Sequence, residues 1–169
     1  MAREERERRY IAEYLMETFP PGTWQTNIPL GQIPEEVVTM YGVKMGGAIF
    51  RPSRRRVDAV CWDGDTYKLI EAKIRDPFEG LSRLPTYLSL AKRSLDLPHY
   101  TGQPFEMMLV VPFSLEWIKN AARDAGITLV EKWYDWIADY VRQYQLYFTE
   151  EYRARRAEVF RARRQLGLE

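Results

Sequence analysis

The sequence predicts an α/β protein in which helices flank a mixed β-sheet. An apolar run at residues 105–111, bounded by Pro104 and Pro112, is typical of a buried central strand. Upstream of it, an Asp-Gly-Asp sequence at residues 63–65 joins two β-forming segments and indicates an antiparallel hairpin. Helical patterns of apolar residues alternate with these strands, and this alternation favours a sheet covered by helices.

The first third of the chain is predicted to hold a helix, a strand and a long irregular segment. Residues 3–19 form the helix, which a Pro-Pro-Gly sequence ends. Its buried face consists of residues at three- and four-residue spacing: Tyr10, Ile11, Tyr14, Leu15 and Thr18. Residues 23–28 form a first strand. Residues 29–53 are rich in Gly and Pro, so we expect an irregular excursion with a short helical turn at residues 35–41.

The middle of the chain carries the predicted hairpin and the helix that follows it. Residues 56–62 and 66–73 are the two paired strands. Residues 78–95 form a helix, and its apolar face consists of Leu81, Leu84, Leu88, Ala91 and Leu95. The apolar strand at residues 105–111 comes next and lies in the interior of the sheet.

The remaining elements close the sheet and begin a tail. Residues 114–125 form a helix with Ser114 as its N-cap and Gly126 as its C-cap. Residues 127–130 form a short strand. We therefore expect a core over residues 1–130 and a helical extension over residues 131–169.

The extension carries large hydrophobic side chains at helical spacing. They are Trp133, Trp136, Ile137, Tyr140, Tyr144, Tyr147 and Phe148. An isolated helix does not leave this much aromatic surface in water. We expect the extension to pack on the core or on a partner, so a homo-oligomer or a protein partner is predicted through the C-terminal helices.

Composition limits where the protein acts and how it binds. The formal net charge of +1 excludes a global attraction to nucleic acid, so any such binding needs a local basic patch. Cys61 is the only cysteine, which excludes an internal disulfide and favours a reducing compartment. No apolar run approaches the roughly 20 residues of a membrane span. We expect a cytoplasmic protein without a membrane partner; a phage-encoded protein of the host cytoplasm or the virion is the alternative.

The hairpin carries the residues with chemical potential. Glu71 and Lys73 are two apart on one strand and share a face, while Asp58 lies on the paired strand. Two carboxylates held together repel unless a cation joins them, and oxygen ligands suit Mg²⁺ or Mn²⁺. A nearby lysine side chain can orient or deprotonate a water. The alternative is an amphipathic hairpin with a solvated charged face.

These residues resemble the motif of the PD-(D/E)XK nuclease superfamily, an acid at a strand end followed by Glu-X-Lys on the next strand. Asp58 matches the acid, and Glu71-Ala72-Lys73 matches the second part. Val57 stands where the motif carries a loosely kept proline. The element order over roughly residues 3–130 is similar to the family's restriction-endonuclease-like core of helix, three-strand meander, helix and strand.

The resemblance implies a metal-dependent deoxyribonuclease that hydrolyses phosphodiester bonds of DNA. It implies catalytic roles for Asp58, Glu71 and Lys73, and Mg²⁺ or Mn²⁺ held by the two carboxylates with the backbone carbonyl of Ala72. Many relatives add a carboxylate from the first helix. Glu7 is the candidate here because it lies on the buried helix face, and Glu13 and Glu17 are rivals.

A second motif follows in the next helix. Arg83-Leu84-Pro85-Thr86-Tyr87 looks like the Gln-Leu-X-X-Tyr signature of the RecB-like branch, with arginine in place of glutamine. The resemblance is therefore to a RecB-like or Holliday-junction-resolvase-like core. Arg83 and Tyr87 become candidates for nucleic-acid binding.

A cluster of arginines precedes the strand that holds Asp58. Its members are Arg51, Arg54, Arg55 and Arg56. We expect them to contact phosphates beside the scissile one, and a solvated loop is the alternative. The alternative function is a non-catalytic PD-(D/E)XK-fold subunit, structural or nucleic-acid-binding, in an assembly such as a phage particle. An unrelated α/β protein is the third hypothesis.

Overall fold

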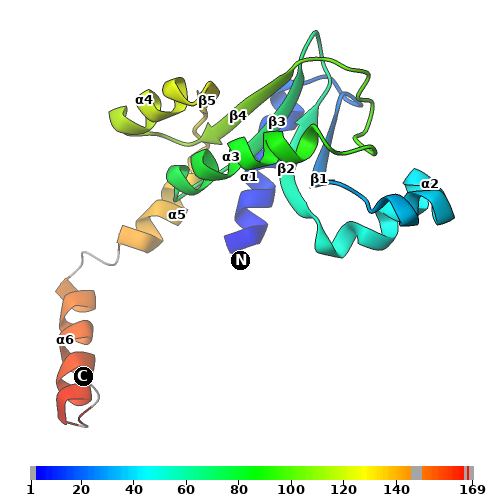
Figure 1. Ribbon diagram of the computed structural model, residues 1–169. Coiled ribbons are helices and arrows are strands. Elements are labelled where there is room, and N and C mark those ends of the chain that lie inside the picture. The colour runs from blue at the N-terminus through cyan, green and yellow to red at the C-terminus, as the bar shows by residue number, and fades with distance from the viewer. Residues whose placement is uncertain (1–2, 146–149, 166, 168–169) are drawn as a thin grey trace. The chain divides into compact units, whose positions relative to one another are not determined.

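A five-stranded mixed sheet forms the centre of the protein. The computed structural model describes residues 3–145, 150–165 and 167, which divide into two compact units between Lys132 and Trp133. The strands are β1 (Trp24–Leu30), β2 (Arg55–Cys61), β3 (Tyr67–Ala72), β4 (Phe105–Val111) and β5 (Ile127–Glu131), in the spatial order β1-β2-β3-β4-β5 (Figure 1). The first two pairings are antiparallel and the last two are parallel. The predicted mixed sheet, its hairpin and the interior position of β4 are confirmed.

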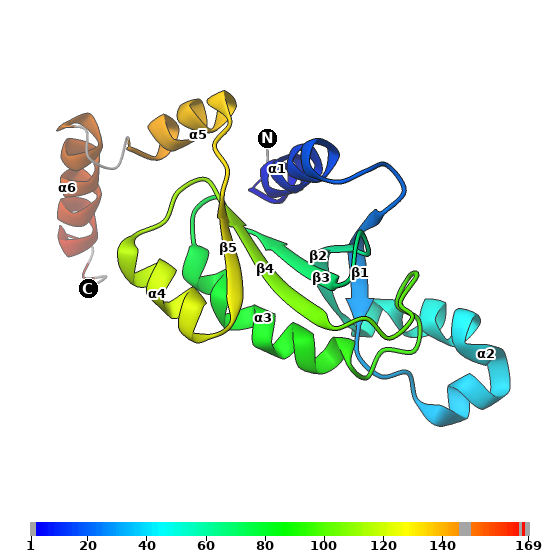
Figure 2. The same ribbon diagram turned by 90° about the horizontal axis from the view of Figure 1, so that it is seen from above.

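Helices cover both faces of this sheet. The helices in the described part of the chain are α1 (Arg3–Thr18), α2 (Glu35–Phe50), the short 3-10 helix η1 (Arg51–Ser53), α3 (Pro77–Ala91), α4 (Glu116–Asp124), α5 (Asp135–Gln145) and α6 (Glu150–Gln165), of which α1, α3 and α4 cover the sheet (Figure 2). α3 and α4 lie on one face of the sheet and α1 on the other (Figure 2). Apolar side chains of α3 and α4 form one buried cluster with Leu69 and Leu109 of the central strands.

The buried face predicted for α1 is confirmed except at its last residue. Tyr10, Ile11, Tyr14 and Leu15 are buried, whereas Thr18 is exposed. The hydroxyl of Tyr10 donates a hydrogen bond to the carbonyl of Lys132 (2.7 Å), which follows β5. This hydrogen bond places Tyr10 beside the end of the sheet. Residues three or four positions away on the same face of α1 therefore lie beside that end as well.

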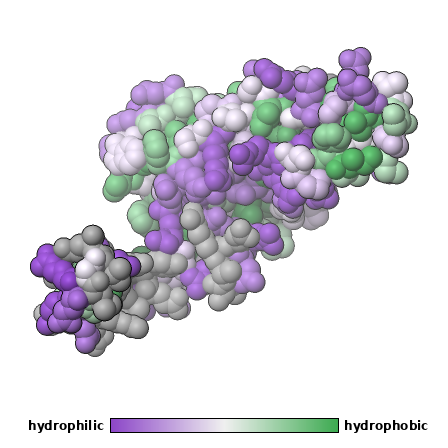
Figure 3. Space-filling view, turned by 60° about the horizontal axis from the view of Figure 1, so that its bottom comes forward, coloured by the Kyte–Doolittle hydropathy of each residue, from purple (hydrophilic) through white to green (hydrophobic). Residues whose placement is uncertain are grey.

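The expected irregular excursion contains a real helix. α2 runs from Glu35 to Phe50 with non-helical geometry at Gly42 (φ 74°, ψ 165°), so the helical turn predicted at residues 35–41 is present, whereas the helical segment after Gly42 was not predicted. Glycine is a poor helix former, which hid the second half of the helix from pattern reasoning. Gly47 permits a close approach to Asp96, because a Cβ would lie 2.5 Å from a carboxylate oxygen of Asp96 and would force that side chain to shift. Hydrophobic side chains gather on the outer surface of α2 (Figure 3): Met40, Tyr41, Met45 and Ile49.

Three element ends differ from prediction. α3 ends at Ala91, so Leu95, assigned to its buried face, is 64% exposed. Ser114 is not the N-cap of α4, because its N–H and hydroxyl both donate to Glu131 and Leu115 takes the cap position. β1 extends through Pro29 to Leu30. Proline lacks a backbone N–H to donate, and an edge strand such as β1 tolerates this loss because it has a neighbouring strand on one side only.

The residues after Lys132 form the second unit. Its described residues include α5 and α6, in agreement with the predicted helical pattern. Tyr147 and Phe148 of the predicted aromatic stripe lie outside the described residues, as does the side chain of Tyr144. The packing of this extension on the core or on a partner stays a prediction. None of the described helices combines the length and the apolar character that crossing a membrane requires.

Candidate functional site

The site lies where β2 and β3 separate. Pairing between the two strands stops at Ala59 and Ile70. Asp58 and Glu71 are the next residues and stand opposite each other, beyond the last pair. Here the backbone N–H of Ala72 donates instead to Oδ2 of Asp58 (2.9 Å). The Asp58 carboxylate therefore takes the place of the backbone carbonyl that would accept this N–H in a regular sheet. The hydrogen bond holds the carboxylate at the point where the two strands separate.

The strand on the other side of Asp58 is distorted as well. The register between β1 and β2 skips the position of Asn27, which faces Asp58. Asn27 has φ of 57°, a left-handed conformation that is uncommon outside glycine. The backbone is thus irregular on both sides of Asp58, as is frequent where a side chain must be aimed rather than packed.

Glu71 is almost fully buried, with 1% of its surface exposed. Its Oε1 lies 3.1 Å from Nζ of Lys73 and 3.7 Å from a guanidinium nitrogen of Arg83. Its Oε2 has no hydrogen-bond partner among the described residues, although it is also buried. A buried carboxylate oxygen without a partner is costly, so this atom is poised to accept a ligand.

Burial and charge act together on Glu71. Desolvation first, and then the neighbouring carboxylate of Asp58, raise the pKa of Glu71 to about 7, despite the opposing effect of Lys73. A cation between the two carboxylates would remove this repulsion. A cation bound there would therefore favour the ionised form of Glu71.

Lys73 is buried among carboxylates. Its Nζ contacts Glu71 and lies 3.6 Å from Oε2 of Glu7. Burial lowers the pKa of Lys73, but Glu71, Asp58 and Glu7 together outweigh burial and raise it. Lys73 is consequently an ammonium at neutral pH. It can donate hydrogen bonds to a water and orient it, but it cannot take a proton from that water.

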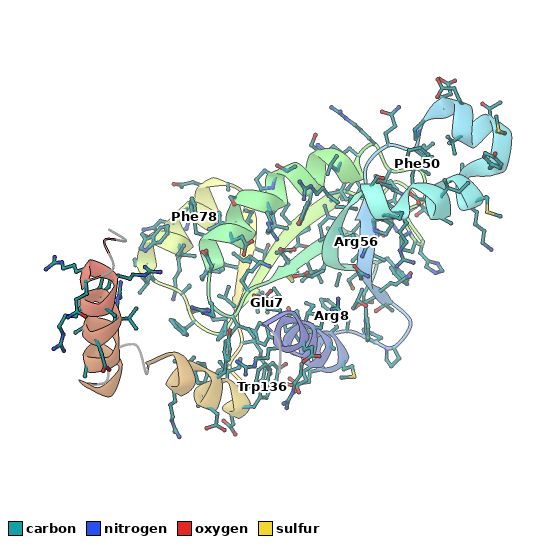
Figure 4. All side chains as sticks on the ribbon, turned by 90° about the horizontal axis from the view of Figure 1, so that it is seen from below. Glu7, Arg8, Phe50, Arg56, Phe78 and Trp136 are labelled. Atoms are coloured by element: carbon teal, nitrogen blue, oxygen red, sulfur yellow. The ribbon has the colours of Figure 1, made fainter. Side chains whose placement is uncertain are left out.

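The acid of α1 reaches the site through Lys73. Glu7 projects from α1 toward the end of the sheet (Figure 4) and contacts the ammonium group. The two rivals are engaged elsewhere, Glu13 with Arg9 (2.7 Å) and Glu17 with Lys132 (2.7 Å). Of the three acids considered in α1, Glu7 is the one that the structure brings to Lys73.

The donor set fits a hard divalent cation. Asp58 and Glu71 offer carboxylate oxygens from facing strands, and the carbonyl of Ala72 lies between Glu71 and Lys73 in the chain. Within the described residues, no three Asp, Glu, His or Cys side chains gather closely enough to form a ligand cluster. Two carboxylates supplemented by backbone and water oxygens are an arrangement that Mg²⁺ accepts.

Pattern reasoning missed Gly80, which forms the wall of the site. A Cβ at Gly80 would lie 2.5 Å from Leu109, 3.2 Å from Cγ of Lys73 and 3.4 Å from Cγ of Glu71. Glycine therefore permits the close approach of α3 to β3 and β4, and a larger residue would require the Leu109 side chain or the helix to shift. The available signal was a glycine inside a predicted helix, which usually has a packing reason.

Gly80→Ala is expected to destabilise the protein by about 1–3 kcal/mol, because the new methyl group overlaps a buried leucine in a packed core. It should also displace Lys73. Urea unfolding measures the loss of stability. The control is Ser82→Ala on the exposed side of α3. Gly64→Ala is unsuitable as a control, because Gly64 has a φ of 83° and alanine would be strained there. A Gly80→Ala protein as stable as the wild type would contradict the close approach of α3.

A basic groove adjoins the carboxylates. It has a volume of about 540 Å³ and lies between α3 and the segment that leads into β2. Its lining residues are Pro52, Arg54, Arg55, Arg56, Ser82, Arg83, Thr86 and Tyr87. Arg83 joins the groove to the site, since it contacts both Glu71 and Glu79. Burial, followed by Glu71, raises the pKa of Tyr87, so its hydroxyl remains a donor.

The four arginines before Asp58 are not equivalent. Arg55 and Arg56 are exposed and line the groove, and Arg51 is exposed in η1 outside the lining set. Arg54 differs from the expectation of phosphate contact. Its side chain is 4% exposed and both terminal nitrogens donate to Asp96 at 2.7 Å. It fixes the groove wall, because the bidentate pair ties the start of β2 to the segment after α3.

The titration of Glu71 predicts a pH-dependent effect of metal on stability. The pKa of Glu71 is raised from 4.5 to about 7, so its contribution is fully present below pH 4.5 and is lost as pH rises through 7, about 3 kcal/mol in total. A cation favours the ionised form and offsets this loss. We therefore expect Mn²⁺ to raise Tm more at pH 8 than at pH 5.5.

Thermal unfolding with and without Mn²⁺ across this range measures the effect, with Glu71→Gln as the matched control that cannot titrate. An equal increase in Tm at both pH values would contradict the assignment of Glu71 to the cation site.

Comparison with known proteins gives limited likeness. No protein-family profile matches the sequence, and no curated protein matches it. One similar solved structure is a protein of unknown function, at 14% identity and a TM-score of 0.43, covering 73% of this chain and 55% of that one. Another is a repair endonuclease from Pyrococcus abyssi, at 18% identity and a TM-score of 0.43, covering 79% of this chain and 48% of that one. This chain therefore spans about half the length of each.

Proposed function

We propose that this chain is a metal-dependent nuclease with a restriction-endonuclease-like fold of the PD-(D/E)XK superfamily, and that it hydrolyses phosphodiester bonds of DNA. One observation carries the proposal. Asp58, Glu71 and Lys73 meet where β2 and β3 separate, and a buried oxygen of Glu71 has no hydrogen-bond partner among the described residues.

Each residue of the site has a role in this proposal. Asp58 and Glu71, with the carbonyl of Ala72, hold Mg²⁺ or Mn²⁺. The bound cation supplies Lewis-acid stabilisation of the charge that develops on the phosphate. The Lys73 ammonium orients the attacking water, and Glu7 holds Lys73 from the α1 side.

The groove supports a polyanionic substrate. Arg55, Arg56 and Arg83 present guanidinium groups beside the carboxylates, and Tyr87 adds a hydroxyl donor. Such groups contact phosphates and fix the register of a nucleic acid without reading its bases. This local patch supplies the basic surface that the net charge of +1 does not.

A second candidate function is a non-catalytic subunit of the same fold, in an assembly that it joins through its C-terminal helices. The ion pairs at Glu71 favour it. Lys73 at 3.1 Å and Arg83 at 3.7 Å already compensate its charge. A site neutralised by its own side chains can persist as a structural ion-pair network.

Cleavage assays separate the two functions. Purified protein is incubated with single-stranded, duplex and branched DNA and with RNA, each with Mg²⁺, Mn²⁺ or EDTA. The nuclease proposal expects cleavage of at least one DNA substrate with metal and none with EDTA. Binding of DNA without cleavage under every condition would support the non-catalytic subunit instead.

A further inference from the structure

An exposed aromatic pair lies at the starts of α3 and α4. Phe78 of α3 and Trp117 of α4 are 57% and 53% exposed, and their ring centroids are 6.1 Å apart at 47°. Phe78 lies at the end of α3 nearest α4 (Figure 4). Neither ring is needed for the buried core, since more than half of each remains accessible.

The pair continues the basic groove along α3. Phe78 and Ser82 are four residues apart and therefore share a face of the helix, and Ser82 lines the groove. Arg83, which also lines the groove, contacts Glu71. A nucleic-acid strand that lies in the groove and continues toward the start of α3 therefore reaches Phe78.

We infer that Phe78 and Trp117 form a stacking platform for unpaired bases of the nucleic-acid strand being cleaved, an inference that rests on the proposed nuclease function. Aromatic rings stack on bases of any sequence, whereas the arginine groove holds only phosphates. Together they select a strand whose bases are unpaired on the Phe78 side, such as single-stranded DNA or a frayed end.

A protein partner fits this surface less well. The two rings and the exposed Phe113 and Leu115, which precede Trp117 in the chain, offer on the order of 400 Å² of apolar surface in total. A stable protein interface needs about 800 Å² from each partner. One or two bases need only one or two rings.

The test measures the affinity of a labelled oligothymidylate and of a blunt duplex of equal length, by anisotropy in Ca²⁺. The double variant Phe78→Ala/Trp117→Ala should bind the oligothymidylate about tenfold more weakly or worse, and the duplex within about twofold of wild type. Trp117→Phe should retain most of the affinity, and Trp117→Leu should not. Met40→Ala on α2 is the matched control for loss of an exposed apolar side chain.

The outcomes separate this inference from the proposed function. A double variant that binds oligothymidylate like the wild type overturns the stacking platform, and wild-type cleavage with Mn²⁺ then leaves the nuclease in place. Full retention of affinity in Trp117→Leu also overturns it, because leucine offers bulk but no ring face. A wild-type protein that neither binds the oligothymidylate nor cleaves DNA overturns both.

Discussion

Replacing Asp58 with asparagine is expected to reduce DNA cleavage at least about a thousandfold, or about 4 kcal/mol of transition-state stabilisation. The change removes a charged cation ligand. The amide oxygen of asparagine can still accept the N–H of Ala72, which Oδ2 of Asp58 accepts at 2.9 Å, so the strand opening is preserved. Initial rates with Mg²⁺ on the DNA that the wild type cleaves best measure the effect.

Asp63→Asn is the matched control, because Asp63 is exposed in the turn between β2 and β3 and makes the same change in charge. It should cleave at the wild-type rate. Full activity in Asp58→Asn with an unchanged circular dichroism spectrum would exclude Asp58 from the cation site.

Replacing Lys73 with methionine is expected to lower the cleavage rate by on the order of 10² or more while Mn²⁺ binding is retained. Methionine fills similar space without charge or a hydrogen-bond donor, so the water loses its positioning group and the ligands stay. Loss of Lys73 removes an interaction that lowers the pKa of Glu71, so the comparison belongs at pH 8.5 or above, where Glu71 is ionised more fully.

Rates at saturating Mn²⁺ and calorimetric Mn²⁺ affinity are compared in the same preparation. Lys119→Met is the control, since Lys119 of α4 pairs with Glu131 of β5 at the protein surface. Equal loss of metal affinity and rate in Lys73→Met would assign Lys73 a structural rather than a water-positioning role.

The sheet was predictable because its signals are local. An Asp-Gly turn fixes the hairpin and an unbroken apolar run fixes β4 as an interior strand. Strand pairing then brings Asp58 opposite Glu71 without further information. The convergence of Asp58, Glu71 and Lys73 follows from the same register.

The contacts of Arg54 could not be predicted, because they depend on an element far along the chain. Its partner Asp96 is 42 residues away, beyond α3. In the sequence, Arg54 is one of four similar arginines, yet it alone of the four is buried. A cluster of arginines in the sequence shows that a segment is basic. Which of these arginines is buried depends on tertiary packing, which the cluster does not show.

Glycine misled the prediction in one place and was overlooked in another. In α2 the glycines made the sequence look irregular, although the segment is helical. Gly46 and Gly47 leave room for the neighbouring side chains of Ile33, Val37 and Asp96. In α3, Gly80 gave little local signal, yet it permits the helix to close over Glu71 and Lys73. A close approach between two elements depends on which residues of each element face each other. The sequence does not show this pairing, so the need for glycine could not be predicted.

Calorimetric titration of Mn²⁺ into metal-free protein at pH 8 tests the cation site most directly. We expect saturable binding by the wild type and its loss in Glu71→Gln, which keeps the shape of Glu71 and removes its charge. Unfolding curves of both proteins confirm that each is folded. A folded wild-type protein that binds no Mn²⁺, or a Glu71→Gln variant that binds it equally well, would contradict a cation site at Asp58 and Glu71.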